Sequence, residues 1–291
     1  MHTNTSKYIN PYSKTVSVYS ERIWTERFHK YGHTGYGSGL IYIYDQYLRL
    51  NATLKALDAV GVTFDGIRVL DVGCGVGDFV MEFAQRGAKE VIGVDISEDV
   101  IKFAEERLSN FKNIKLIPGK IEKLKFKSNY FDLVTSITVL QHITNEKAFF
   151  RAVDNIISAT RFGGKILILE NSPTNSEYVV KVKKNRNIVI RTREEWINIF
   201  SSRGCRLIYE GGIPQIGTRF LSYCDYIFNL MNIKHFVEHR FFKPYANRRD
   251  LMSGKLSVII KCAVKATLLF FPLTANLTKL NILIFEKNLW R

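Results

Sequence analysis

The stretch VLDVGCGVGDF, residues 69–79, decides the fold of this chain. Its apolar first residues predict a strand buried on both faces, as in a parallel sheet. Gly73, Gly75 and Gly77 then stand on alternate positions, where they allow a tight turn and let a ligand approach the backbone. A helical pattern follows over 79–85. The stretch therefore predicts the first strand, turn and helix of a nucleotide-binding βαβ unit.

A second apolar run, residues 91–94, ends in Asp95, 24 residues after Asp71. Parallel α/β sheets bind their ligands at the carboxyl ends of the strands. We therefore expect the carboxylate of Asp95 to lie at the ligand site, where it can accept hydrogen bonds from both hydroxyls of a ribose.

The glycine spacing separates two kinds of nucleotide site. A dinucleotide site usually has the spacing G-x-G-x-x-G, which seats a pyrophosphate on the helix N-terminus. Here the spacing is G-x-G-x-G, with Asp71 before it and Asp78 after it. Two carboxylates repel a pyrophosphate, but they suit S-adenosylmethionine (SAM), which carries a sulfonium and an ammonium group. The alternative is a glycine-rich turn that binds no ligand.

These residues and later segments resemble the class I SAM-dependent methyltransferases, in particular the broad group that modifies small molecules. The resemblance covers about residues 66–213. FDLVTS at 131–136 and VLQHI at 139–143 resemble the fourth strand and its loop, and RFGGKILILE at 161–170 resembles the fifth strand. The resemblance implies SAM as the cofactor, without a metal. The candidate cofactor-binding residues are Asp71, Gly73, Cys74, Gly75, Gly77, Asp95, Ile96, Ile121 and Ser136.

The position that meets the adenine amino group departs from the family. Relatives often carry an acid there, whereas this chain reads PGKI over 118–121. Lys120 cannot accept a hydrogen bond from an amine. The backbone of Ile121 is left to pair with the ring, with Glu122 as a further candidate. By resemblance, Ile96 is expected to pack on the adenine face.

His142 and Glu170 are the candidate catalytic residues. Methyl transfer is an in-line displacement, and a hydroxyl nucleophile must also lose a proton. His142 lies in the loop after the fourth strand, and Glu170 ends the fifth strand at the same edge of the sheet. The two predict a His–acid pair in which Glu170 orients the ring and His142 takes the proton. A structural role for His142 and a ligand contact by Gln141 are the alternatives.

Alternating strands and helices over 65–212 predict an α/β fold: a doubly wound, mostly parallel, seven-stranded Rossmann-like sheet with an antiparallel last strand. Residues 1–64 predict a helical extension, in which the loop 30–39 either closes over the cofactor or only connects two helices. Residues 213–280 are too many for a hairpin loop and predict a helical insert that sets substrate specificity. Residues 281–291 supply the last strand.

The charge of the chain is concentrated near its end. The formal net charge is +15, and residues 181–291 hold 20 Lys and Arg against 7 Asp and Glu. Such a field favours an anionic acceptor, a nucleic acid or an acidic membrane surface, unless it is only a solvated surface. The apolar run 256–271 is too short to span a bilayer and predicts an amphipathic helix, which packs on the domain or rests on a membrane. Cysteine usage and the polar N-terminus predict a cytoplasmic protein.

Three functions are compatible with the sequence. The favoured one is a SAM-dependent methyltransferase whose acceptor is a small molecule, with a hydroxyl of a sugar, a lipid-linked compound or a secondary metabolite as the acceptor group. An RNA or DNA methyltransferase is an alternative that rests on the basic C-terminal third alone. The third is a SAM-binding protein without catalysis, against which the intact glycine turn and Asp95 argue.

Overall fold

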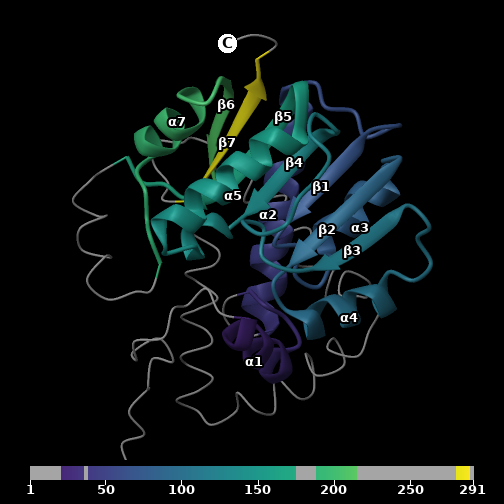
Figure 1. Cartoon of the computed structure of the whole chain (residues 1–291). Helices are drawn as coiled ribbons and strands as arrows, with labels where there is room; N and C mark the ends of the chain where they lie inside the picture. Colours follow the sequence, from purple (N-terminus) through teal and green to yellow (C-terminus); the bar gives the residue numbers. More distant parts are fainter. Residues whose placement is uncertain (1–20, 36–38, 175–187, 215–279, 289–291) are drawn as a thin grey trace, which may run out of the picture.

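The computed structural model describes residues 21–35, 39–174, 188–214 and 280–288, which form a seven-stranded sheet flanked by helices (Figure 1). The strand order is β3-β2-β1-β4-β5-β7-β6. The strands are β1 (Arg68–Val72), β2 (Glu90–Asp95), β3 (Ile114–Pro118), β4 (Phe131–Ile137), β5 (Thr160–Asn171), β6 (Cys205–Gly212) and β7 (Leu280–Lys287). The helices are α1 (Glu21–Tyr31), α2 (Gly39–Ala59), α3 (Asp78–Gln85), α4 (Glu98–Arg107), α5 (Glu146–Ala159) and α7 (Arg193–Ser201), with a 3₁₀ turn, η1, at Leu140–His142. The predicted α/β sheet is confirmed.

Alternate side chains of the central strands pack into two different hydrophobic layers. Val69 of β1 belongs to a cluster with residues of α2, α3 and α4. Its neighbour Leu70 belongs to a second cluster with residues of α5 and α7. Because successive side chains of a strand point to opposite faces, both layers require apolar residues. This explains why the strand reads as a continuous apolar run.

The last strand of the sheet runs against the others. The strands β1 to β5 pair in parallel, for example Leu70 with Ile92, whereas β7 lies antiparallel between β5 and β6. Leu167 of β5 pairs with Ile284, and Leu207 of β6 pairs with Phe285. The expected antiparallel last strand is confirmed, and it begins at Leu280.

Part of the predicted organisation lies outside the described residues. This holds for the insert, apart from its first two residues and its last, for the run 256–271 within it, and for residues 1–20. The insert, its role in specificity and the division into domains therefore stay predictions. Within the described ranges, no helix is long and apolar enough to cross a membrane.

Polar caps fix where two helices begin beside the ligand edge of the sheet. Asn145 caps α5, with its side chain accepting a hydrogen bond from the backbone N–H of Ala148. Thr192 and Glu195 form a reciprocal capping box at the start of α7. The cap at Asn145 matters most for the site, because it ends the short segment that carries His142.

The N-terminal extension is attached to the sheet domain through both of its helices. Tyr42 and Leu48 of α2 are buried in the same cluster as Val69. Figure 1 shows α1 near α4, and the contacts there are a hydrogen bond of 2.7 Å between Thr25 and Ser97 and one of 2.8 Å between His29 and Asp99. The extension therefore supplies side chains to the ligand edge of the sheet.

Candidate active site

A cavity opens at the carboxyl ends of β1, β2 and β4, where this fold class is expected to bind its ligands. Eight of the residues predicted from the sequence line it: Asp71, Gly73, Cys74, Gly75, Asp95, Ile96, Ile121 and His142. Three predicted residues do not line the cavity: Gly77, Ser136 and Glu170. The cavity therefore brings together eight of the eleven predicted residues and leaves the other three outside its lining.

The glycine turn has the backbone conformation that its sequence predicts. Gly73, Gly75 and Gly77 have φ values of 73°, 53° and 87°, a left-handed region that disfavours side chains. A Cβ atom on Gly73 would lie 2.1 Å from Cγ2 of Val139, in the loop after β4. A Cβ atom on Gly77 would instead meet Leu108, 2.7 Å away. Gly73 thus allows the two ligand loops to approach each other, while Gly77 serves helix packing.

Asp95 lies at the end of β2 and holds the glycine turn. Its Oδ2 accepts a hydrogen bond of 3.0 Å from the backbone N–H of Gly75, and its Oδ1 accepts one of 3.0 Å from Ser97. A carboxylate oxygen has a second lone pair, so each oxygen can still accept a hydroxyl. Burial raises the pKa of Asp95, and the backbone donors oppose this shift. The arrangement fits the expected ribose contact.

Asp71 is a buried carboxyl whose environment lacks a positive charge. Burial raises its pKa to about 7, a hydrogen bond of 2.6 Å from Thr135 opposes the shift, and the charge of Asp95 adds to it. A cation in the cavity would lower this pKa by favouring the ionised form. The site therefore fits a positively charged ligand such as SAM. The thiol of Cys74 also lines the cavity, and burial holds its pKa well above the usual range.

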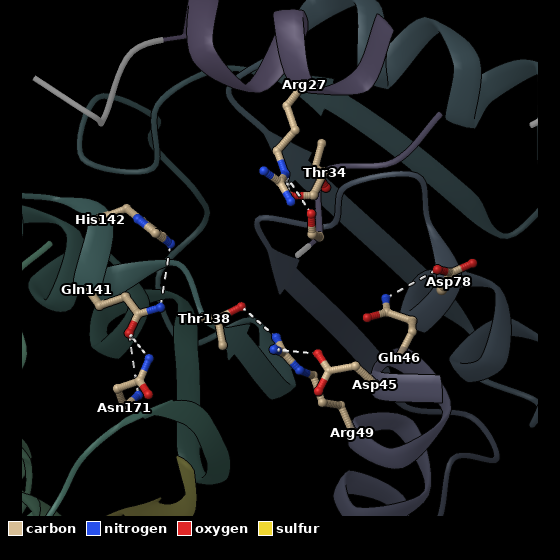
Figure 2. A network of polar contacts seen from close by, with 11 residues as sticks. Arg27, Thr34, Asp45, Gln46, Arg49, Asp78, Thr138, Gln141, His142 and Asn171 are labelled. Atoms are coloured by element: carbon tan, nitrogen blue, oxygen red, sulfur yellow. Dashed lines mark hydrogen bonds and ion pairs between the residues drawn. The ribbon is translucent and has the colours of Figure 1, made fainter. Parts of the chain in front are cut away.

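Asp78 does not contribute the free negative charge that the sequence suggested. Its Oδ1 forms a buried ion pair of 2.6 Å with Arg107, and its Oδ2 accepts a hydrogen bond from Tyr42. The same Oδ2 also accepts a hydrogen bond from Gln46, which Figure 2 shows. Its charge is therefore balanced within the protein. The argument against a pyrophosphate rests on Asp71 and Asp95 and not on Asp78.

Ser136, predicted as a cofactor-binding residue, does not line the cavity. Its side chain is fully buried, and the cavity is lined instead by the next three residues, Ile137, Thr138 and Val139. The physical reason is the alternation of side chains along β4. Thr135 points toward Asp71, to which it donates a hydrogen bond, so the side chain of Ser136 points to the other face.

Thr138 is a strained residue at the cavity wall. Its φ of 56° is unusual for a β-branched residue, and such strain tends to occur at functional sites. Its hydroxyl oxygen accepts a hydrogen bond of 3.0 Å from Nη1 of Arg49. Nη2 of Arg49 pairs with Asp45 at 2.6 Å. Figure 2 shows this chain of contacts, which ties α2 to the end of β4.

Glu170 does not pair with His142, contrary to the prediction. Its Oε1 accepts hydrogen bonds from the backbone N–H groups of Val139 and Leu140, at 3.0 and 2.8 Å, and Oε2 has no partner among the described residues. Burial raises the pKa of Glu170 to about 8. The carboxyl group therefore holds the loop after β4 and does not reach the ring.

His142 lines the cavity as a buried, neutral imidazole. Burial lowers its pKa to about 4, and the charges of Arg27 and Arg49 add to this effect. The ring of Trp24, from α1, packs edge-on against it with ring centroids 4.9 Å apart. The imidazole is thus placed at the ligand edge, with a lone pair and without a carboxylate partner.

Gly119 and Ile121 line the cavity together with Ile96, and these are the residues expected to meet the adenine. The carbonyl oxygen of Ile121 accepts a hydrogen bond of 2.9 Å from Asn155. Its backbone carbonyl is therefore already engaged within the protein. Glu122 is buried but does not line the cavity. The apolar side chains of Ile96 and Ile121 suit the faces of a planar ring.

The sequence missed most of the cavity wall that the N-terminal extension supplies. Trp24, Tyr42, Gln46 and Arg49 line the cavity, as do Thr34 and Gly35 of the loop 30–39, which was predicted either to close over the cofactor or only to connect two helices. No spacing rule links α1 and α2 to the sheet edge. His33, in the loop 30–39, does not line the cavity. It is buried against Tyr42, with ring centroids 3.8 Å apart.

The fold and the site together define a class of protein. A glycine turn follows β1, an acid ends β2, and an antiparallel β7 completes a seven-stranded sheet. This combination is that of the class I SAM-dependent methyltransferases.

Comparison with known proteins supports this assignment. A protein-family profile described as "Methyltransferase domain" matches residues 63–204. Residues 63–204, just under half of the chain, thus match a methyltransferase domain, and the sheet has the strand topology of the class I SAM-dependent methyltransferases. It is 31% identical over 122 residues to the ubiquinone/menaquinone biosynthesis C-methyltransferase UbiE of Shewanella sp. (strain W3-18-1), covering 40% of this chain and 47% of that protein. It is 29% identical over 109 residues to the demethylmenaquinone methyltransferase of Staphylococcus aureus (strain MRSA252), covering 37% and 44%. The chain therefore spans about half the length of these relatives.

Solved structures share the fold. Phosphoethanolamine N-methyltransferase 2 of Haemonchus contortus, solved with S-adenosyl-L-methionine, has a TM-score of 0.57 at 22% identity, covering 92% of this chain and 60% of that one. SpnF, described as a [4+2]-cyclase, has a TM-score of 0.53 at 19% identity, covering 82% and 81%. Because the two carry different activities on one fold, the reaction has to be argued from the site.

Proposed function

We propose that this chain transfers the methyl group of SAM to a small-molecule acceptor, with a hydroxyl as the favoured acceptor group. The observation that carries the proposal is the division of the cavity into two sides. Asp71 and Asp95 come from β1 and β2 and are called the donor side here, whereas Trp24, Arg49 and His142 come from α1, α2 and η1 and are called the acceptor side. The acidic side suits a cationic methyl donor, and the opposite side presents a base and an aromatic surface to the acceptor.

The residues of the acidic side bind and orient the donor. Asp95 offers one free lone pair on each oxygen to the two ribose hydroxyls. Asp71 becomes ionised beside a positive charge, because the cation offsets the effect of burial on its pKa. Ile96 and Ile121 provide apolar surface for the adenine. When bound, SAM supplies a methyl group activated by the neighbouring sulfonium.

On the acceptor side, His142 is the group that accepts the proton of the hydroxyl. Its low pKa keeps it neutral at physiological pH, so its lone pair is free to act. Trp24 packs on the ring and limits the access of water to it. Arg49 and Thr138 define the neighbouring wall of the cavity. These residues hold the acceptor in line with the donor methyl group.

Calorimetric titration with S-adenosylhomocysteine (SAH) tests the first half of the proposal. The wild type should bind, and Asp95→Ala should lose about tenfold to a hundredfold in affinity through the lost charged hydrogen bonds. Asp95→Asn, which keeps one acceptor oxygen, should lie between them. Asp154→Ala is the matched control, because Asp154 is an exposed residue of α5 that pairs with Arg203. Equal affinity in all four proteins would overturn the proposed cofactor site.

Turnover with labelled SAM tests the second half. The acceptor panel should contain hydroxyl compounds of the sugar, lipid-linked and secondary-metabolite classes. It should also contain quinol rings, because relatives over the domain are described as C-methyltransferases acting in ubiquinone and menaquinone biosynthesis. Transfer to a ring carbon is the second candidate reaction. No turnover with any class, despite SAH binding, would favour a SAM-binding protein without catalysis.

Methylation of RNA or DNA remains an alternative that rests on the basic residues of 181–291. Nucleic-acid binding through phosphates weakens steeply as salt increases. A binding assay with RNA and DNA at two salt concentrations therefore discriminates between the two acceptor types. We expect no salt-dependent binding tight enough to compete with a small-molecule acceptor.

A further inference from the structure

A buried chain of polar side chains leads from the end of β5 to the cavity (Figure 2). Nδ2 of Asn171 donates a hydrogen bond of 2.7 Å to Oε1 of Gln141, and the backbone N–H of Asn171 lies 3.4 Å from the same oxygen. The other end of the Gln141 amide, Nε2, lies 3.5 Å from Nε2 of His142. Gln141 and His142 are both almost fully buried.

The orientation of the Gln141 amide follows from Asn171. A backbone N–H can only donate a hydrogen bond, so it requires an oxygen opposite it. This places Oε1 of Gln141 toward Asn171 and its NH₂ group toward His142. An amide NH₂ group can only donate, so Nε2 of the imidazole must be the acceptor.

The protonation state of His142 then follows from this contact. A neutral imidazole carries one proton, on either Nδ1 or Nε2. Arg27 from α1 and Arg49 from α2 both disfavour the charged ring, and Glu170, the nearby acid of β5, is turned to the loop backbone. With Nε2 as an acceptor, the single proton lies on Nδ1, for which no partner exists among the described residues.

We propose that Gln141 and Asn171 are positioning residues that fix His142 in its Nδ1-protonated tautomer, so that Nε2 carries a lone pair, which an acceptor can use once it displaces the long contact with Gln141. This inference rests on the proposed function and narrows its acceptor to a compound that brings an O–H or N–H group to Nε2. The contact of 3.5 Å is long for a hydrogen bond, so a well-placed acceptor hydroxyl competes for the same lone pair.

The proton balance of the step is simple. The proton leaves the acceptor hydroxyl for Nε2 of His142. The electron pair of the oxygen forms the new bond to the methyl carbon, and the C–S bonding pair stays on sulfur. His142 then carries a positive charge, which it loses to solvent after product release. Two neutral amides thus perform the orienting role that the sequence had assigned to Glu170.

Nitrogen-15 NMR of the imidazole rings in the SAH-bound protein tests the proposal without turnover. A His142→Asn variant assigns the signals of this ring among the six histidines. The wild type should show a protonated Nδ1. Gln141→Glu places an acceptor beside Nε2, so it should move the proton to Nε2 and raise the pKa of His142 by one unit or more. Gln141→Met keeps the volume without a donor and should yield a mixture of tautomers.

Turnover measures the consequence. Gln141→Met should lower kcat by roughly twofold to fivefold with little change in KM, because only part of His142 then has the correct tautomer. Gln141→Glu should move the acid limb of the kcat/KM profile to higher pH. Gln85→Glu is the control. Gln85 is an exposed residue of α3, and it is distant in sequence from Gln141, His142 and Asn171. SAH affinity confirms that each variant is folded.

The outcomes separate the inference from the proposed function. A wild-type ring protonated on Nε2, or a tautomer unchanged in Gln141→Met, would overturn the positioning role even if the enzyme is active. A protein that fails to bind SAH would overturn the proposed function itself. Turnover that is insensitive to both Gln141→Met and His142→Asn would show that the contact between Gln141 and His142 has no role in the reaction.

Discussion

The two sides of the cavity are built in different ways. The donor side comes from the ends of β1 and β2 and the turns that follow them, within residues 71–96, together with Gly119 and Ile121 after β3. The acceptor side combines α1, α2 and the loop after β4, which are separated by up to about a hundred residues. Backbone geometry dominates the first side, and side-chain contacts between distant segments dominate the second.

This difference explains which parts of the site tolerate change. On the donor side, Gly73 and Asp95 serve both the fold of the turn and the binding of the ligand. On the acceptor side, Trp24 and Arg49 reach the cavity from helices whose own stability comes from packing elsewhere. We therefore expect substitutions on the donor side to abolish binding, and those on the acceptor side to change specificity and rate.

The largest effect is expected for Gly73→Ala. The new Cβ would lie 2.1 Å from Val139 Cγ2 in a left-handed backbone, which forces the two ligand loops apart. SAH binding should be lost, and the free energy of unfolding should fall by about 2–5 kcal/mol from backbone strain and overpacking together. Calorimetric titration and denaturant unfolding measure the two effects.

Gly61→Ala is the matched control for this variant. Gly61 has a φ of 71°, close to the 73° of Gly73, but a Cβ there meets nothing within 4 Å. Its free energy of unfolding should fall by only about 1–2 kcal/mol, from the backbone strain of a left-handed alanine, and its affinity for SAH should be that of the wild type. If both variants bind SAH equally well, close approach of the loops is not required for the donor site.

The second effect is a pH dependence of SAM binding through Asp71. Its pKa of about 7 means that the carboxyl is protonated and neutral below this pH, and ionised above it. A cationic donor prefers the ionised form, so affinity should rise with pH up to about 7 and then level off, by up to about tenfold per pH unit on the acid side. Titration with SAM from pH 5.5 to 8.5 measures the curve.

Asp71→Asn supplies the control for this curve. It keeps an oxygen for the hydrogen bond from Thr135 but cannot ionise. Its affinity should be low and independent of pH over the same range. The same slope in Asp71→Asn as in the wild type would assign the titration to a different group.

A smaller effect is expected for Trp24→Ala on the acceptor side. The substitution removes an aromatic contact with His142, worth about 0.5–1.5 kcal/mol beyond the buried area. KM for the acceptor should increase about tenfold or less, with SAH affinity unchanged. Tyr31→Ala, an exposed position of the same helix, is the control. Loss of SAH binding in Trp24→Ala would show that the two sides of the cavity are not separable.

The smallest effect is expected for Glu170→Gln. The amide oxygen can still accept from the backbone of Val139 and Leu140, and the carboxyl is largely protonated at neutral pH, because burial raises its pKa to about 8. The pH profile of kcat should therefore match that of the wild type. A shift of the acid limb of this profile to another pH would support the functional pairing of His142 with Glu170 that the sequence suggested.

The sequence predicted the sheet and the donor side well, because both depend on local patterns. The apolar runs, the glycine spacing and the acid at Asp95 are each readable within a few residues. The errors came where an orientation had to be guessed. Ser136 was assigned to the cavity although strand alternation turns it away, and Glu170 was paired with His142 although it binds the loop backbone.

By itself, the sequence determined the class of the fold, the position of the ligand edge and the acids of the donor side. These follow from hydrophobic periodicity and backbone conformation, which neighbouring residues specify. Only the tertiary structure decided that Arg107 balances Asp78, that α1 and α2 complete the cavity, and that Gln141 contacts His142. Such contacts join residues far apart in the chain, and the packing of the folded molecule alone fixes their partners.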